Sequence, residues 1–495
     1  MDTKVIEADV LVIGGGLAGT FAAIKAKESG ANKVTLVSKG KLGKDSVSTF
    51  AAGVYMMNFP EDDKDALIRT YTYSDSFGAG LYDPEWLNVH LDESYERLLE
   101  MEGWGVEWEK TPNGKFERMV QKHGQLKCMF HGTQLMEAMA QKVKTSDVNV
   151  LGHIMITDLL TENGEPGGRV TGAIGFDCRT GEFKVLKSKA TVLAAGACTY
   201  KSRFAGHKFQ TGESYAMAYR AGAVLGRFEI GEIHHETSTE YDIQGLNMFQ
   251  GLGGKFVNAN AEEFLHEYDP VLGNKTSMPR IAEAAAMEVR AGRGPMYLDM
   301  THFTPEQVRK LKVVLPIPVR IMERAGIIIG DRIVRKMEWA PAFLATNAMG
   351  GGVFTNTRCE TNLPGLYVCG DAMARSIALP SRLPGAAVTG ARAGRFAAEY
   401  SREAKEPGID ERQVEMLKKS TSAPLEIKDG IEPDHVIIAL QEAVIPYDVV
   451  VISRDDRLEK AINELERIRD EEVPLLYASD AHYLRLANEA RNMVL

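Results

Sequence analysis

Three glycines near the start of the chain have the spacing that accommodates a pyrophosphate group. Gly14, Gly16 and Gly19 lie in VLVIGGGLAGTFAA, which reads as a buried strand, a tight turn and the start of a helix. In this G-x-G-x-x-G pattern the glycines permit the turn, the approach of the phosphates and close packing of helix on strand, while the helix N-terminus favours negative charge. The stretch therefore predicts a dinucleotide site that includes Leu17 and Ala18.

The end of the second predicted strand leaves the type of dinucleotide open. In nicotinamide-binding sites an acidic residue at this place usually holds the ribose. Here Ser38 and Lys39 follow the predicted strand at 34–37. We expect both residues to contact the cofactor, but they do not identify it.

A second strand–glycine signature, LPGLYVCGDAMA, lies far along the chain and is followed by LPGAAVTGARAG, the small-residue start of a helix. In an extended dinucleotide site the acid accepts a hydrogen bond from a polyol hydroxyl, and the helix N-terminus lies beside a reduced, anionic ring. A chance Gly-Asp turn would look similar when taken alone, but the two signatures together favour FAD, which lies across the sheet. The residues expected at the cofactor are Gly370, Asp371, Gly385, Ala386 and Ala387.

Alternating strand and helix patterns must position these residues. Continuous apolar runs predict strands buried on both faces of a parallel sheet, and ATVLAAGA at 190–197 predicts a further strand with Ala195 and Gly196 at the cofactor. We predict an α/β fold with a doubly wound, Rossmann-like FAD-binding domain, an inserted α+β capping domain and a C-terminal helical region. The predicted bounds are 1–227 and 346–400 for the two pieces of the FAD-binding domain, 228–345 for the cap and 401–495 for the helices.

Composition restricts the kinds of partner. The 495 residues are 44% hydrophobic and carry a formal net charge of −10, which argues against nucleic-acid binding through phosphate neutralisation. The five cysteines include no C-x-x-C pair, so no metal or iron–sulfur site is expected. Neither a signal peptide nor an apolar run of spanning length is visible, so we expect a cytoplasmic protein whose membrane contact, if any, is through a partner.

Stretches along nearly the whole chain match one known family in order. They are VLVIGGGLAGTFAA, VTLVSKG, STFAAG, TGESYAMAYRAGA, GRGPMYLDM and NAMGGGVFTNTRCETNLPGLYVCGDA. The chain therefore resembles the fumarate reductase/succinate dehydrogenase flavoproteins, and within that family it is nearest to L-aspartate oxidase and to the adenylylsulfate reductase α subunit. In this family SKG is the usual sequence after the second strand, which accounts for the missing acid.

The resemblance implies that the FAD is held without a covalent bond. In the fumarate and succinate enzymes the flavin is attached to a histidine, and the matching position here is Val47 in DSVSTFAAG. The STF that follows is similar to the L-aspartate oxidase variant, and we expect Ser48 and Thr49 to contact the cofactor.

The dicarboxylate pocket of the family is altered in this sequence. The H-P-T segment of the family is HHET here, which keeps His234 but puts Glu236 at the position of the threonine. The glutamate of GEGG is Leu252, and the histidine before TMGG is Thr346 or Asn347. A fumarate-like dianion would lose several partners, and Glu236 would repel it.

Two arginines and one histidine remain as candidate catalytic residues. Arg280 in SMPRIAEAAAMEV lies near the place of the proton-donating arginine of the family, and Arg382 in LPSRLPG resembles its second substrate arginine. A surface salt bridge is the alternative for either arginine, and a structural hydrogen bond is the alternative for His234. His131 is less favoured as a catalytic residue: its alternatives are to face the cofactor domain or to cap the following helix.

The resemblance implies two-electron chemistry at flavin N5 on a small anionic substrate, either hydride transfer at carbon or attack on sulfur. With no cluster ligands of its own, the chain is expected to exchange electrons with an iron–sulfur (ferredoxin-like) subunit or a soluble carrier. An oxygen-using oxidase of the L-aspartate oxidase type, and a non-catalytic or RNA-directed FAD protein, are the alternatives. The sequence leaves open whether the chain forms a homo-oligomer.

Overall fold

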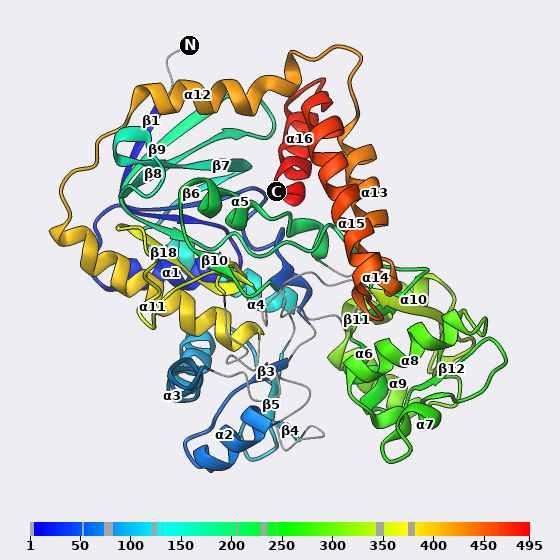
Figure 1. Ribbon diagram of the computed structural model, residues 1–495. Helices are drawn as coiled ribbons and strands as arrows, with labels where there is room; N and C mark the ends of the chain where they lie inside the picture. Colours follow the sequence, from blue (N-terminus) through cyan, green and yellow to red (C-terminus); the bar gives the residue numbers. More distant parts are fainter. Residues whose placement is uncertain are drawn as a thin grey trace.

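The computed structural model has three parts, which Figure 1 shows together. A layered α/β part holds both glycine signatures, a smaller lobe lies to one side of it, and the C-terminal helices lie along the sheet and reach the lobe. The described residues are 4–51, 54–73, 83–120, 126–130, 132–203, 206–228, 235–243, 245–342, 351–374 and 382–495.

The layered part is built on a seven-stranded sheet in the order β6-β2-β1-β9-β8-β7, with β18 also paired to β9. Strands β6, β2, β1, β9 and β18 run parallel, whereas β7 and β8 are antiparallel to their neighbours. Every position of β2 is buried, as expected for a strand covered on both faces. This sheet confirms the predicted doubly wound class. The strands are β1 (Lys4–Ile13), β2 (Val34–Ser38), β6 (Asn149–Gly152), β7 (Ile154–Thr161), β8 (Val170–Asp177), β9 (Phe183–Leu193) and β18 (Leu366–Val368).

Strand β9 joins two segments that are far apart in the sequence. Its first half pairs with the antiparallel β8, whereas its second half pairs in parallel with β18 and places Leu193 opposite Val368. Leu193 also lies opposite Ile13 of β1. Strands β1 and β18 therefore end at the same level on either side of β9, and Gly14 and Gly370 lie at one edge of the sheet.

The predicted strand at 190–197 is the end of the longer β9, which leaves the sheet after Leu193. The other elements of the layered part cover the sheet or extend from it. Its helices are α1 (Leu17–Glu28), α2 (Lys64–Tyr73), α3 (Pro84–Gly103), α4 (Gly132–Thr145), α5 (Glu213–Arg220) and α11 (Arg382–Glu403). Its short elements are η1 (Val47–Phe50), β3 (Val54–Met56), β4 (Arg118–Val120), β5 (Leu126–Met129), η2 (Glu162–Gly164), η3 (His207–Phe209), β10 (Leu225–Gly226), β17 (Gly352–Val353) and η5 (Gly370–Ala372).

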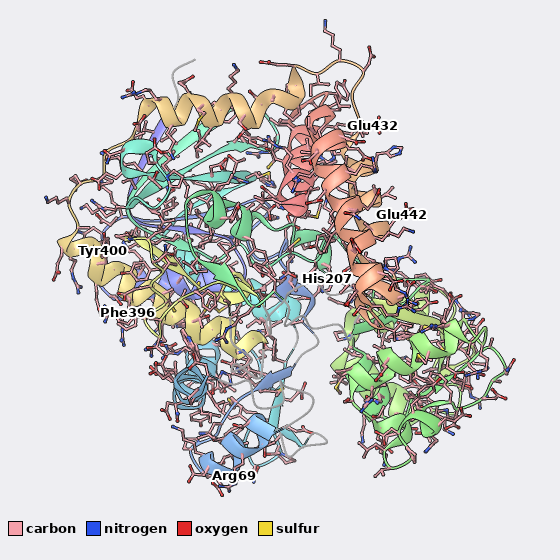
Figure 2. All side chains as sticks on the ribbon, in the orientation of Figure 1. Arg69, His207, Phe396, Tyr400, Glu432 and Glu442 are labelled. Carbon is pink, nitrogen blue, oxygen red and sulfur yellow. The ribbon has the colours of Figure 1, made fainter. Side chains whose placement is uncertain are left out.

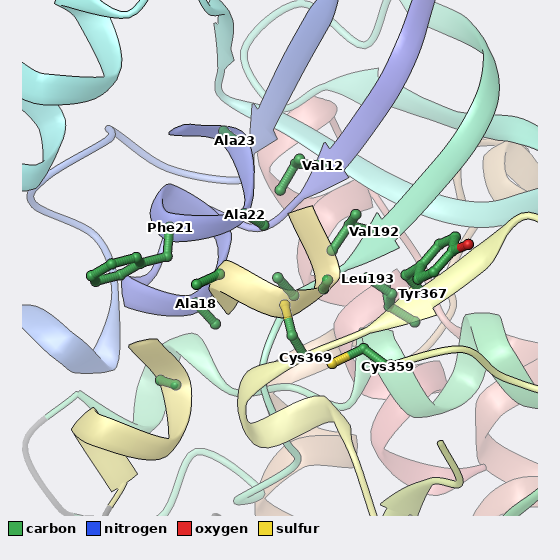
Figure 3. Close-up of a cluster of buried hydrophobic side chains, with 14 of the residues drawn as sticks. Val12, Ala18, Phe21, Ala22, Ala23, Val192, Leu193, Cys359, Tyr367 and Cys369 are labelled. Carbon is green, nitrogen blue, oxygen red and sulfur yellow. The ribbon is translucent and has the colours of Figure 1, made fainter. Parts of the chain in front are cut away.

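Helices α1 and α11 touch through their backbones. A Cβ placed on Gly390 would lie 2.3 Å from the carbonyl oxygen of Ala18, and one on Gly394 would lie 2.1 Å from that of Ala22. Only glycine permits this distance. Figure 3 shows the resulting cluster, in which Ala18 and Ala22 lie with Phe21 and with side chains from the ends of β1, β9 and β18.

The smaller lobe, green in Figure 1, has a four-stranded antiparallel sheet in the order β11-β16-β13-β12. Its buried cluster, which includes Phe249, Phe256, Leu298 and Trp339, is distinct from the cluster around α1. These features confirm the predicted α+β cap; the predicted boundary between 345 and 346 lies outside the described residues. The elements are β11 (His235–Ser238), α6 (Leu246–Gly251), β12 (Lys255–Val257), α7 (Leu265–Tyr268), η4 (Gly273–Lys275), α8 (Met278–Arg290), β13 (Met296–Asp299), α9 (Pro305–Val314), α10 (Pro316–Arg324), β14 (Ile328–Ile329), β15 (Arg332–Ile333) and β16 (Met337–Ala342).

The C-terminal part is helical, as predicted. In α15 the side chain of Ala461 is buried but those of Leu458 and Ile462 are exposed, so the apolar positions of this helix are only partly packed. Among the described helices, none combines the length and the apolar character needed to cross a membrane. The elements are α12 (Glu411–Ser422), η6 (Ala423–Leu425), α13 (Pro433–Val444), α14 (Tyr447–Val450), α15 (Asp455–Arg467), η7 (Ile468–Glu472), η8 (Val473–Leu475) and α16 (Ala481–Val494).

The contact between α1 and α11 predicts that Gly394→Ala destabilises the protein. The added methyl group would force the two helices apart, at a cost of about 1–3 kcal/mol, typical of overpacking. Gly103→Ala is the matched control, since Gly103 is also helical and nothing lies within 4 Å of its Cβ position. Thermal melting should show a lower midpoint for Gly394→Ala and no loss for Gly103→Ala. Equal midpoints would contradict the close contact.

Candidate functional site

The two glycine signatures meet at the carboxyl edge of the parallel strands. Gly14 has φ +119°, and a Cβ there would lie 2.2 Å from the carbonyl oxygen of Ala194. A Cβ on Gly19 would lie 1.9 Å from the carbonyl oxygen of Gly14. Gly370 has φ +68°, and its Cβ would lie 2.7 Å from that of Ala18. Three of the predicted glycines are therefore required by the packing of the chain itself.

Gly16 has a different environment. Its φ is −76°, which any residue can adopt, and a Cβ there would approach nothing closer than the Oγ of Ser48 at 3.7 Å. Gly16 is the N-cap of α1 and has no side chain that could cap the helix. The next N–H, that of Leu17, donates to the Oγ of Ser48 at 3.2 Å. Open space before a helix N-terminus is what a pyrophosphate requires. The residues present therefore fit a dinucleotide.

Ser38 is the last residue of β2, beside the glycine turn, and Lys39 follows it. A Cβ on Gly15 would lie 2.8 Å from the Oγ of Ser38. The Nζ of Lys39 is directed into the protein, where it lies 2.5 Å from Glu213 and 2.7 Å from Glu489. Although burial favours the neutral form, these two carboxylates raise the pKa of Lys39 above its usual value. Direct contact of Lys39 with the cofactor stays a prediction.

Asp371 is fixed at the end of the second signature. Its Oδ2 accepts a hydrogen bond from the Nε2 of Gln210 at 3.1 Å, and its backbone carbonyl accepts one from the hydroxyl of Tyr215 at 3.1 Å. The preceding N–H, that of Gly370, donates to the Oγ1 of Thr389 in α11 at 3.0 Å. The acid is thus held from three sides while remaining partly exposed, which suits a group that accepts from a polyol hydroxyl.

The remaining predicted cofactor residues lie around the same edge. Gly196 follows β9 with φ +80°, and a Cβ there would lie 3.5 Å from the side chain of Gln210. The Oγ1 of Thr49 lies 3.1 Å from the Oγ of Ser46. Contact with the cofactor stays a prediction for the following residues: Ser48, Thr49, Ala195, Gly196, Gly385, Ala386 and Ala387.

Val47 opens η1 next to Ser48. A Cβ on Gly206 would lie 3.1 Å from the Cα of Val47, so the chain is closely packed at this point. A valine side chain has no nucleophilic atom. The protein therefore offers no covalent attachment at the position where the resembling enzymes have histidine.

The candidate catalytic residues are not brought together within the described part of the chain. His131, His234, Thr346 and Asn347, and the side chains of Glu236 and Arg382, lie outside the described residues. Arg280 is described: it stands in the first turn of α8, its side chain is 62% exposed, and its Nη1 lies 2.9 Å from Glu283. The catalytic assignments stay predictions.

One arginine of the cap has a clear structural role. The guanidinium of Arg293, from the GRGPMYLDM stretch, donates to both carboxylate oxygens of the buried Glu288, at 2.8 and 2.5 Å. The hydroxyl of Tyr268 also donates to Glu288, at 2.8 Å. Hydrogen bonding from Arg293 is the main cause that lowers the pKa of Glu288 to about 2, against the effect of burial. This pair fixes the turn that follows α8 to the helix itself.

Several buried polar residues at the site were missed from the sequence. Gln210, Tyr215 and Thr389 hold the second signature, and Glu489 holds Lys39. The stretch QTGESYAMAY carries two of them, but its pattern indicates only a family match and a helix. No local pattern points to Glu489, because its partner lies near the other end of the chain.

Comparisons with known proteins agree with this geometry. The family model described as "FAD binding domain" matches residues 9–388. The chain is 27% identical to an uncharacterised FAD-dependent oxidoreductase of Methanocaldococcus jannaschii, over 94% of this chain and 85% of the relative. It is also 27% identical to a subunit of the fumarate reductase (CoM/CoB) of Methanothermobacter marburgensis, over 100% and 91%. A fumarate reductase flavoprotein subunit of Mycobacterium tuberculosis is 29% identical, over 79% and 70%.

Solved structures show the same fold. The flavoprotein of E. coli quinol fumarate reductase superposes with a TM-score of 0.86 at 20% identity, covering 99% of this chain and 88% of that one. Adenylylsulfate reductase of Archaeoglobus fulgidus superposes with a TM-score of 0.78 at 24% identity, covering 99% and 87%. At these identities the likeness concerns the fold.

The different environments of the glycines predict different effects of substitution. Gly16→Val should fold but lose its flavin, because the side chain fills only the space before α1. Gly19→Val should lose both its stable fold and its flavin, because its Cβ would overlap the carbonyl of Gly14. Flavin absorbance per polypeptide and the melting midpoint of the flavin-free protein would measure this. A Gly16→Val protein that keeps its full flavin would contradict the assigned pyrophosphate position.

Val47 predicts a flavin that dissociates when the protein unfolds. Acid precipitation should leave all yellow colour in the supernatant, because no side-chain nucleophile is available at the attachment position. Flavin that remains with the pellet after washing would show a covalent link elsewhere.

Proposed function

Because the chain belongs to the FAD binding domain family and is an FAD-dependent oxidoreductase of the fumarate reductase/succinate dehydrogenase type, we propose that it transfers two electrons between a small anionic substrate and the flavin. The observation that carries this proposal is the meeting of the two signatures at one sheet edge, with space before α1 and a fixed Asp371 beside it.

FAD, when bound, supplies two-electron chemistry at N5 of its ring. The residues of this chain have other tasks. The N-terminus of α1 binds the pyrophosphate, and Asp371 orients the polyol. The cap covers the flavin edge and excludes water from the substrate. An arginine binds the anionic substrate and stabilises the charge that develops on it.

We place the substrate outside the simple dicarboxylates. The position where the resembling enzymes have a glutamate is Leu252, which ends α6 and packs against the apolar cluster of the cap. An apolar side chain there cannot pair with a polar or charged group of the substrate. The class of substrate is therefore an anion that needs fewer partners than fumarate, such as another enoate, a sulfur oxyanion ester or an amino acid.

An iron–sulfur subunit is the proposed electron partner. Within the described stretches, no three His, Cys, Asp or Glu side chains are grouped as metal ligands would be. The relatives named above include a subunit of fumarate reductase (CoM/CoB) and a fumarate reductase flavoprotein subunit, so each is one component of a larger enzyme. A separate component that carries the clusters would supply the electron path to or from the flavin.

An oxidase is the second candidate. L-aspartate oxidase of Pseudomonas aeruginosa is 26% identical over 388 residues, and the sequence around Val47 resembles that enzyme. In this case molecular oxygen would accept the electrons, and no protein partner would be needed.

Anaerobic reduction of the flavin followed by a screen of oxidants tests the proposal. We expect one anionic class among enoates, adenylyl sulfate and imino acids to reoxidise the flavin, and fumarate to do so more slowly than enzymes usually turn over, about 1–10³ s⁻¹. A single-wavelength flavin trace measures both. Reoxidation by oxygen alone would favour the oxidase, and fumarate turnover in the usual range would contradict the altered pocket.

Arg280 gives the sharpest catalytic prediction. If its guanidinium binds the substrate when the cap closes, Arg280→Ala should lower turnover by about 10²–10³, as does removal of a preorganised charge-stabilising donor, and Arg280→Lys should restore part of it. Flavin content should not change, because α8 lies outside the cofactor site. Arg290→Ala, at the other end of the same helix, is the control. Normal turnover in Arg280→Ala would make Arg280 a surface residue and transfer the role to Arg382.

A further inference from the structure

A buried cluster of charges joins the last helix of the chain to the cofactor edge. The carboxylate of Glu489 in α16 is fully buried and lies 2.7 Å from Lys39, 2.6 Å from Lys201 and 2.7 Å from Arg485. Lys39 directly follows β2, and Lys201 lies in the loop after β9. This one carboxylate therefore holds two segments of the layered part. Glu489 lies outside residues 9–388, the range that the family model matches.

The segment 210–213 connects this cluster with the second signature. The Oγ1 of Thr211 accepts a hydrogen bond from Lys39 at 2.8 Å, and Glu213 pairs with Lys39 at 2.5 Å. The neighbouring Gln210 donates to Asp371 at 3.1 Å. Consecutive residues thus contact both the lysine after β2 and the acid after β18.

The segment is hydrogen-bonded to the loop that follows β9. The N–H of Thr199 donates to the carbonyl of Gln210 at 3.0 Å, and the N–H of Gly212 donates to the carbonyl of Ala197 at 3.2 Å. His207, labelled near the centre of Figure 2, is buried in the same loop, with its Nδ1 2.8 Å from the Oγ of Ser202. A displacement of Lys39 would therefore be transmitted to Asp371.

The balance of charge makes Glu489 the critical member. Three cations, Lys39, Lys201 and Arg485, face two carboxylates, Glu213 and Glu489. Without Glu489 three positive charges, on side chains that are only 16–23% exposed, would face one carboxylate, and incompletely paired charge away from water is unfavourable. The side chain of Lys39 would lose one of its two carboxylate partners and change its position.

We propose that Glu489 is a positioning residue for FAD. By holding Lys39 it keeps the end of β2 and the 210–213 segment in the arrangement that binds the cofactor. The C-terminal helix α16 is thereby a working part of the FAD site, although it contributes no residue to either signature.

FAD affinity of the full-length flavin-free protein tests this proposal. Glu489→Gln should raise the Kd for FAD, measured by fluorescence titration, by about tenfold or more, since loss of one partner of a buried charge pair is strongly felt. Glu489→Asp should recover part of the affinity. Lys39→Gln should raise the Kd as well. The Kd of the double variant Lys39→Gln/Glu489→Gln should be no higher than that of the single variant with the higher Kd, because both substitutions act through one pair.

Asp158→Asn is the matched control. Asp158 pairs with Arg220 of α5 at 2.6 Å, and Arg220, whose side chain is 37% exposed, also reaches Asn492 of α16 at 3.3 Å, so this second contact docks the same helix without Lys39. Its Kd should stay near that of the parent protein, even where its melting midpoint falls as far as that of Glu489→Gln. The visible circular dichroism of the bound flavin should change only in the Glu489 and Lys39 variants.

Two results would overturn the proposal. The first is an unchanged Kd for FAD in Glu489→Gln. The second is an equal loss of FAD affinity in Glu489→Gln and Asp158→Asn at equal melting midpoints, because Glu489 would then only stabilise α16. If Glu489→Gln does not fold, Lys39→Gln and Glu489→Asp decide the question. Unchanged affinity in both would then exclude the positioning role.

Discussion

The parallel pairing of β9 with β1 on one side and β18 on the other is the constraint on which the rest of the molecule depends. It brings two segments from distant parts of the sequence to the same level, so that Gly14 and Gly370 leave the sheet together. Once the strands are neighbours, helices α1 and α11 must also be neighbours. Gly390 and Gly394 allow their backbones to touch. A shift of one residue in the register of β18 would turn its side chains to the other face and separate the two signatures.

Burial of charge at this edge follows from a second constraint. The loop after β9, the residue after β2 and the start of α5 carry charged groups beside α16, where Glu213 is buried and the side chain of Lys39 is only 21% exposed. Such groups are tolerated in a protein interior only when they are paired, and Glu489 completes the pairing. Whatever the net stability of these ion pairs, each contact fixes the distance between two segments of the chain.

Sequence reasoning predicted the parts of the site that depend on local pattern. The glycine spacing located the turn after β1, and the Gly-Asp pair located the end of β18, because each needs only the strand before it and the helix after it. The pattern also predicted separate tasks for Gly16 and Gly19, but not the atoms that each meets, the Oγ of Ser48 and the carbonyl of Gly14, because those depend on how the chain folds. Glu489 was missed for the same kind of reason. Its partner is determined by how α16 packs against the sheet, and no spacing in the sequence encodes that contact.

The cap differs from the FAD-binding part because it has its own core. Its buried cluster around Phe249 and Trp339, and the pair formed by Glu288 and Arg293, stabilise the lobe without residues of the FAD-binding part. Substitutions in the lobe can therefore change its side chains while the cofactor edge stays intact. Leu252 illustrates this: an apolar side chain at a position where the resembling enzymes have a glutamate packs against the core of the lobe. If the lobe binds the substrate, as we propose, the same fold can keep one cofactor and change its substrate, since the two parts rest on separate sets of buried contacts.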